Sequence, residues 1–140
     1  MAERFLVLLV LTAALALVFL TIRAWNRRRV RSLMHVSGVE TWANLGEAPD
    51  GRRALVTFST PSCATCHTAQ APAVKVAEAQ LGTSTVRVIK VDTARQPQVA
   101  RAFGVLTVPS TIVLAPTGRV VAVNHGFAPS RRLVEQLQRA

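Results

Sequence analysis

The chain has 140 residues, of which 50% are hydrophobic, and its formal net charge is +10 at pH 7. This length allows one domain plus a short appendage, and two cysteines are too few for a disulfide-stapled secreted scaffold. Six arginines and one glutamate give residues 1–31 a charge of +5, and the other 109 residues also total +5. Because the body of the chain is only mildly basic, we expect no nucleic-acid partner.

Near the N-terminus, residues 5–22 are predicted to form one transmembrane helix. Phe5–Ile22 is a run of eighteen residues without a charge, about 27 Å long in a helix, which is close to a hydrocarbon core of about 30 Å. A small domain could hardly surround such a helix as part of its core. A cleaved signal peptide is disfavoured because Glu3 offsets Arg4 and Thr21–Asn26 has no small-residue cleavage site. We therefore expect an uncleaved anchor, with Trp25 at the membrane interface.

The basic residues around this segment predict its orientation. Arginines follow the helix at positions 23, 27, 28, 29 and 31, whereas only Arg4 precedes it. Positively charged flanks tend to stay inside, so a single-pass protein with its C-terminal domain in the cytoplasm is favoured over an extracytoplasmic domain. The expected organisation is an anchor and basic stem at residues 1–32, followed by one domain at residues 33–140.

The body alternates between predicted helices and strands. Ser37 and Glu40 have capping-box spacing, ahead of Trp42 and Leu45 as apolar anchors of a first helix. The later elements are β-branched strands and helices punctuated by glycine or proline: a strand over 54–59, a helix over 63–81 interrupted at Pro72, a strand over 86–91, a short helix over 97–103, a hairpin of 111–114 and 120–123, and a final helix from 129. This order predicts an α/β fold with a mixed sheet and helices on both faces.

The two cysteines, Cys63 and Cys66, lie directly after the strand at 54–59 and at the start of a predicted helix. Three residues apart, they can close a small disulfide and reopen it. Unpaired N–H groups and the helix dipole favour a thiolate at a helix N-terminus, and a thiolate is the species that attacks disulfides. A structural disulfide would more usually close a long loop. The pair is therefore a candidate redox-active dithiol.

From about Leu33 to Ala140 the chain resembles thioredoxin. The resemblance is carried by Phe58–Cys66, Lys90–Asp92 with Pro97, Phe103–Val105, Val108–Thr111, and Gly118. A C-x-x-C motif after a strand, together with Val-Pro before a later strand, is much more specific than C-x-x-C alone. The resemblance implies a thioredoxin-like fold and a membrane-anchored thiol–disulfide oxidoreductase with Cys63 and Cys66 as the catalytic pair. It also implies that Pro109 is cis, lies beside the cysteines, and helps bind extended substrate segments together with Val108.

Three positions depart from the thioredoxin pattern. Ser62 replaces the tryptophan before the first cysteine, and Ala64-Thr65 replaces Gly-Pro between the cysteines. The buried acid that assists proton transfer aligns with Thr57, while the nearby lysine of the family matches Lys90. The second cysteine therefore lacks its customary base, and the direction of electron flow is not set by this motif.

The expected partners are protein or small-molecule disulfides and dithiols, a redox donor or acceptor protein, and the membrane through residues 5–22; no cofactor or metal is expected. One alternative is a non-catalytic thioredoxin-like binding or scaffold module. Another is a c-type haem protein, because His67 completes a C-x-x-C-H motif. His67 is either an exposed residue of the first helical turn or an imidazolium that lowers the pKa of the Cys63 thiol. Zinc is disfavoured because the resemblance does not bring the cysteines together with His67 and His125.

Overall fold

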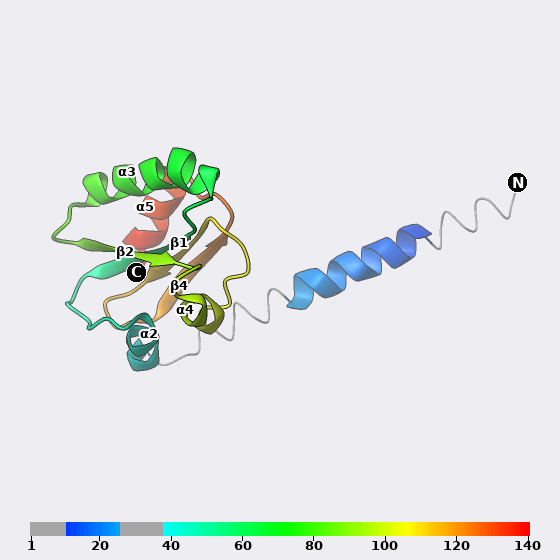
Figure 1. The fold of residues 1–140 in the computed structure, drawn as a ribbon, viewed down its shortest axis with the longest axis horizontal. Helices are drawn as coiled ribbons and strands as arrows, with labels where there is room; N and C mark the ends of the chain where they lie inside the picture. The colour runs from blue at the N-terminus through cyan, green and yellow to red at the C-terminus, as the bar shows by residue number, and fades with distance from the viewer. Residues whose placement is uncertain (1–10, 26–37) are drawn as a thin grey trace, which may run out of the picture. The chain divides into compact units, whose positions relative to one another are not determined.

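The computed structural model describes residues 11–25 and 38–140, which are the parts drawn in colour in Figure 1. By its internal contacts the chain divides into two units, Met1–Ser32 and Leu33–Ala140. In the first unit, residues 11–25 form a helix with exposed side chains, including Trp25.

The predicted transmembrane segment lies only partly within this description. In residues 11–25 and 38–140, no helix combines the length and the apolar character needed to cross a membrane. Residues 5–10 of the predicted span, and the arginines at 27, 28, 29 and 31, lie outside the described residues. Membrane anchoring therefore stays a prediction.

The second unit is built on a four-stranded mixed sheet in the order β2-β1-β3-β4. Strand β1 (Arg53–Ser59) pairs in parallel with β2 (Val86–Asp92) and antiparallel with β3 (Ser110–Leu114). Strand β4 (Val120–His125) pairs antiparallel with β3 and completes the predicted hairpin. The β-branched runs of the sequence thus become the strands, and the prediction of a mixed sheet is confirmed.

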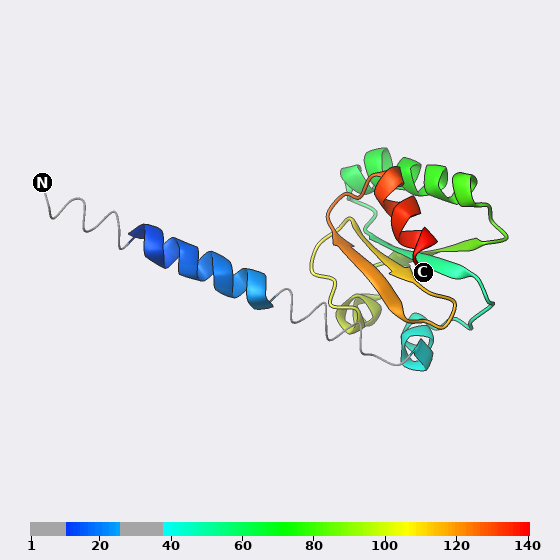
Figure 2. The same cartoon turned by 180° about the vertical axis from the view of Figure 1, so that it is seen from behind.

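Helices cover both faces of the sheet, as Figures 1 and 2 show from opposite sides. Helices α2 (Gly38–Leu45) and α4 (Pro97–Ala102) pack on one face, whose core includes Trp42, Phe58 and Phe103. Helices α3 (Ala71–Leu81) and α5 (Ser130–Gln138) pack on the other face, around core residues such as Leu55 and Leu133. Alternate residues of β1 point to opposite faces, so this one strand contributes to both cores.

Helix α2 is held close to the turn between β3 and β4. Gly118 in this turn has φ of +83°, and a Cβ atom there would lie 2.7 Å from Nε1 of Trp42. Trp42 is 4% exposed, so the apolar anchor predicted at this position of the first helix is buried. A side chain at position 118 would therefore collide with the indole, as well as being disfavoured by the positive φ.

Candidate redox site

The helical segment that carries the cysteines begins at Ala64, one residue after Cys63, and runs on into α3. Its first part contains a π-helical turn, η1 (Cys66–Gln70), in which the N–H of Ala71 donates to the carbonyl of Cys66. Pro72 follows at the start of α3. A proline in an α-helix leaves a carbonyl without a donor and crowds the preceding turn, and a π turn accommodates such a mismatch. The interruption predicted at Pro72 therefore takes the form of this wider turn.

Cys63 and Cys66 are joined by a disulfide, with their Cα atoms 5.3 Å apart. The N–H of Cys66 donates to the sulfur of Cys63 over 3.2 Å, so Cys63 has the position and hydrogen bond of a helix N-cap residue. In the reduced protein the same N–H would favour a thiolate on Cys63. Cys63 is partly exposed, whereas Cys66 is only 5% exposed. The two cysteines are thus unequal in exposure to solvent.

The loop that contains Pro109 forms another part of the site. The Val108–Pro109 peptide bond is cis, as the resemblance to thioredoxin implies, and Pro109 lines the same cavity as Cys66. The carbonyl of Pro109 accepts a 2.9 Å hydrogen bond from the N–H of Gly126. Pro109 is thereby tied to the loop between β4 and α5.

Gln70 links this same loop to the helical segment that begins at Ala64 and runs on into α3, which we call the redox helix. Its side chain is 4% exposed; its Nε2 donates to the carbonyl of Ala128 over 3.1 Å, and its Oε1 accepts from the N–H of Ala128 at 2.9 Å. The Gln70 side chain thus gives hydrogen-bond partners to both the N–H and the carbonyl of the buried residue Ala128. The Gln70–Ala128 clamp, together with the Gly126–Pro109 bond, therefore connects the segments around the disulfide.

The three supporting residues predicted from the sequence, Thr57, Lys90 and His67, lie around the same space. Thr57 and Lys90 are register partners on β1 and β2, and the Thr57 hydroxyl donates to the carbonyl of Ile89 at 3.5 Å. Thr57 is partly rather than fully buried. His67 is exposed, and its Nε2 lies 3.2 Å from the carbonyl of Pro61, so its ring is anchored on the turn that leads into Cys63.

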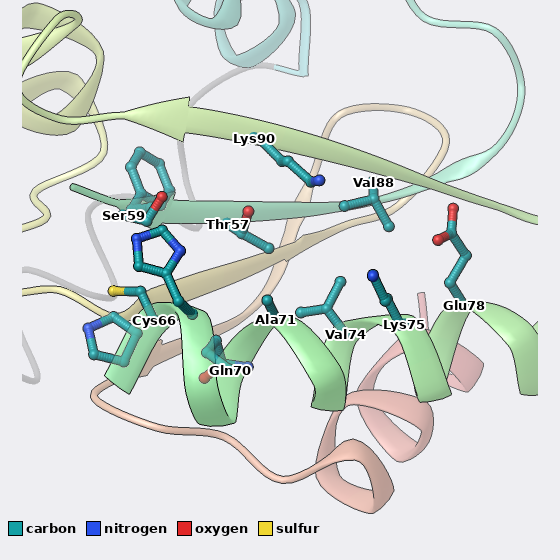
Figure 3. A pocket seen from close by; sticks show the side chains of 13 residues that line it. Thr57, Ser59, Cys66, Gln70, Ala71, Val74, Lys75, Glu78, Val88 and Lys90 are labelled. Atoms are coloured by element: carbon teal, nitrogen blue, oxygen red, sulfur yellow. The ribbon is translucent and has the colours of Figure 1, made fainter. Parts of the chain in front are cut away.

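A cavity of about 470 Å³ lies between η1, α3 and the strands β1 and β2. This volume is in the range of small-ligand pockets. Cys66, Gln70 and Val74 line its helical wall, and Thr57 and Lys90 line its strand wall, as Figure 3 shows. The cavity brings together the predicted residues Cys66, Thr57, Lys90, His67 and Pro109.

The zinc alternative from the sequence can be compared with this geometry. Among residues 11–25 and 38–140, no three histidine, cysteine or acidic side chains are grouped so that they could hold a metal ion. His125 is exposed at the end of β4.

Residues 40–139 match the sequence pattern of a protein family whose description is Thioredoxin. This match spans more than half of the chain, and the chain therefore belongs to the thioredoxin family. No curated protein sequence matches the chain.

Solved structures show the same fold. Thioredoxin-2, titled a component of the malaria parasite protein secretion machinery, is 22% identical with a TM-score of 0.58, and the alignment covers 64% of this chain and 84% of that one. Thioredoxin of Fasciola hepatica is 25% identical with a TM-score of 0.54, over 64% and 81% of the two chains. MTB dsbF, solved in mixed oxidized and reduced forms, is 22% identical with a TM-score of 0.52, also over 64% and 81%.

Two residues of the cavity were not identified from the sequence. Gln70 forms its hydrogen bonds with the backbone of Ala128, which is 58 positions away in the sequence. No local sequence pattern indicates such a distant partner. Lys75 lies on the exposed side of α3, where a lysine is ordinary. The signal that could have found it is composition, because the chain has fifteen arginines but only two lysines, Lys75 and Lys90.

Proposed function

We propose that this protein is a membrane-anchored thiol–disulfide oxidoreductase that acts as a protein-disulfide reductase. The observation that carries the proposal is the Cys63–Cys66 disulfide at the start of a helix, with the N–H of Cys66 directed at the Cys63 sulfur. Membership of the thioredoxin family supports it. The partly exposed Cys63 is the sulfur that a substrate reaches, and the buried Cys66 is the resolving sulfur.

In the first step, the Cys63 thiolate attacks one sulfur of a substrate disulfide. A bond forms between Cys63 and that sulfur, the substrate disulfide breaks, and the other substrate sulfur leaves as a thiolate that takes a proton from solvent. Val108 and Pro109 lie on the segment that the family uses for extended substrates. The cis bond at Pro109 and its place on the same cavity as Cys66 support this role.

In the second step, Cys66 loses its proton and attacks Cys63. The Cys63–Cys66 disulfide forms, the mixed disulfide breaks, and the second substrate sulfur leaves as a thiol after protonation. Two electrons have then passed from the protein to the substrate. The opposite sequence of steps would oxidise a substrate dithiol.

A reduction assay separates this proposal from a non-catalytic scaffold module. The full-length protein in neutral detergent, with dithiothreitol as the electron source, is expected to reduce the interchain disulfides of insulin faster than dithiothreitol alone. The Cys63→Ser variant should give only the rate of dithiothreitol. A wild-type rate equal to that background would support the scaffold alternative, which the replacements at Ser62 and Thr57 favour.

The second part of the proposal is the membrane anchor. Phe5–Ile22 is uncharged and apolar enough to span a bilayer, and arginines follow it. We infer a single-pass protein whose redox domain faces the cytoplasm, where the reducing pool keeps cysteines as thiols. Its substrates would then be disulfides close to the membrane surface.

A further inference from the structure

The cavity beside the disulfide is long, and its two ends differ in chemistry. Its helical wall extends from Cys66 to Glu78, about 18 Å at roughly 1.5 Å per residue. Cys66 and Pro109 line it near the disulfide, and Lys75 and Glu78 line the part farther along α3. We call this cavity the lysine groove.

Both lysines of the chain line the groove. The other fifteen basic residues are arginines, so lysine is confined to this one place. Lys75 comes from α3 and Lys90 from β2, and Figure 3 shows their side chains extending from opposite walls into the space between helix and strands. An ammonium group is a compact point charge on a flexible stem, and two of them can close on an anion from both sides.

The groove has more lysines than acidic side chains along its walls. Within residues 11–25 and 38–140, neither Lys75 nor Lys90 takes part in an ion pair, although four arginines do. Glu78 is the one acidic residue that lines the groove, and the other ionisable side chain along it is that of His67 near the disulfide. A cleft with an excess of one sign of charge concentrates ligands of the opposite sign.

We propose that the lysine groove binds an acidic, extended segment of the protein whose disulfide is reduced; this inference rests on the proposed function. The groove is lined by Cys66 and Pro109, and Cys63 is bonded to Cys66 with a Cα–Cα distance of 5.3 Å, so a substrate with its disulfide at Cys63 can continue into it. Lys75 lies about 14 Å from Cys66 along the helix axis, which corresponds to about four extended residues. Acidic side chains about four residues from the reactive cysteine therefore reach Lys75, and Lys90 faces the same cavity from the strand wall.

Three synthetic peptides test this preference. Each has one cysteine in a mixed disulfide with 2-mercaptoethanol and carries two aspartates, two asparagines or two lysines, four and five residues away on both sides. With the full-length protein in neutral detergent, kcat/KM for the aspartate peptide is expected to exceed that for the asparagine peptide by about threefold to thirtyfold, the range that two partly exposed ion pairs supply. The advantage should shrink with added salt.

The Lys75→Glu variant should lower the ratio of kcat/KM for the aspartate peptide to kcat/KM for the lysine peptide by at least about tenfold. Arg101→Glu is the matched control: it makes the same change in net charge on α4, which covers the opposite face of the sheet, and should leave the ratio within about twofold of wild type. The proposal would be overturned if kcat/KM of the wild-type protein differed by less than about twofold among the three peptides. It would also be overturned if Lys75→Glu and Arg101→Glu changed the ratio equally.

Two further measurements separate this proposal from the reductase activity itself. Bis(2-hydroxyethyl) disulfide has no charge, so its reduction tests the reductase activity alone. If the protein reduces this compound but does not discriminate among the three peptides, the proposed function stands and the groove proposal is wrong. Calorimetry with the aspartate peptide carrying serine in place of cysteine measures binding without chemistry. Binding that weakens in Lys75→Glu but not in Arg101→Glu supports the groove even if no disulfide is reduced, and equal binding overturns it.

Discussion

At the scale of single residues, position 57 lies on the same cavity as Cys66, and we propose that its side chain affects how Cys66 loses its proton. Thr57 offers only a hydroxyl, which donates to the carbonyl of Ile89, and a neutral hydroxyl is a far weaker base than a carboxylate. Its register partner Lys90 and the open cavity lie beside it. Position 57 therefore offers no carboxylate for this proton, and we propose that the proton of Cys66 passes to water in the open cavity.

The Thr57→Asp variant should have a faster resolving step. A positioned general base contributes about 10²–10⁴-fold, so we expect reductase turnover to rise by at least about tenfold when resolution limits the rate. Because Thr57 is only partly buried and lies beside Lys90, the cost in unfolding free energy should be about 1 kcal/mol. Thr57→Asn is the neutral control of similar size. Unchanged turnover in a folded Thr57→Asp protein would show that water already accepts this proton fast enough.

Of the predicted site residues, Cys63 and Cys66 have a local signature, because they lie three positions apart directly after a strand. The roles of Pro109, Thr57 and Lys90 were expected only from the resemblance to thioredoxin. Gln70 has no such signature, because both of its hydrogen bonds go to Ala128, in a loop that only the folded chain brings near. Local patterns reveal chemistry, whereas positioning residues depend on long-range packing.

At the scale of elements, the Gln70–Ala128 clamp joins the π turn to the loop between β4 and α5. A second polar bridge, between Asn124 and Gln136, joins β4 to α5 with hydrogen bonds of 2.8 and 2.9 Å. Asn124 also donates to the Thr111 hydroxyl. The two bridges are similar in chemistry, but only the first touches the redox helix and is fully buried.

Gln70→Ala should destabilise the fold more than Gln136→Ala does. Loss of Gln70 leaves the N–H and carbonyl of Ala128, which is 0% exposed, without partners, at a cost of about 3 kcal/mol. Gln136 is partly exposed, and Asn124 keeps its hydrogen bond to the Thr111 hydroxyl. The Gln136→Ala variant should therefore lose about 1 kcal/mol of unfolding free energy. Urea unfolding of both variants measures the difference. Equal losses would mean that the clamp at Gln70 is not a main support of the site.

The helices and strands were largely predictable because each has a local cause. The β-branched run at 86–91 becomes β2, and the short helix expected over 97–103 ends at Ala102. The sheet order β2-β1-β3-β4 depends on pairings between distant segments, which periodicity does not specify. The π turn likewise could not be deduced from Pro72 alone, because a proline is compatible with several kinds of helix break.

At the scale of the whole molecule, the two units suggest different roles in one protein. The N-terminal unit supplies the uncharged run and the arginine stem, and the C-terminal unit supplies the dithiol. Five arginines after the predicted span against one before it favour a cytoplasmic redox domain.

Labelling of Cys63 in intact cells tests this orientation. After mild reduction, a membrane-impermeant maleimide should not reach Cys63 until the cells are lysed, because the bilayer separates the reagent from the domain. A Cys63→Ser, Cys66→Ser double variant provides the background, since the chain has no other cysteine. Fractionation should place the protein in the membrane pellet. Labelling without lysis would put the domain outside and contradict the arginine argument.

Trapping of the reaction intermediate tests the central claim most directly. In the Cys66→Ser variant the resolving thiol is absent, so Cys63 should remain joined to its substrate in a mixed disulfide, and mass spectrometry of tryptic peptides identifies the linked residue. We expect a substrate peptide joined to Cys63 and released by dithiothreitol, and no trapped substrate in Cys63→Ser. Trapping through Cys66 in Cys63→Ser, with none through Cys63, would contradict the assignment of nucleophile and resolving cysteine. Absence of trapping in both variants would contradict the oxidoreductase function.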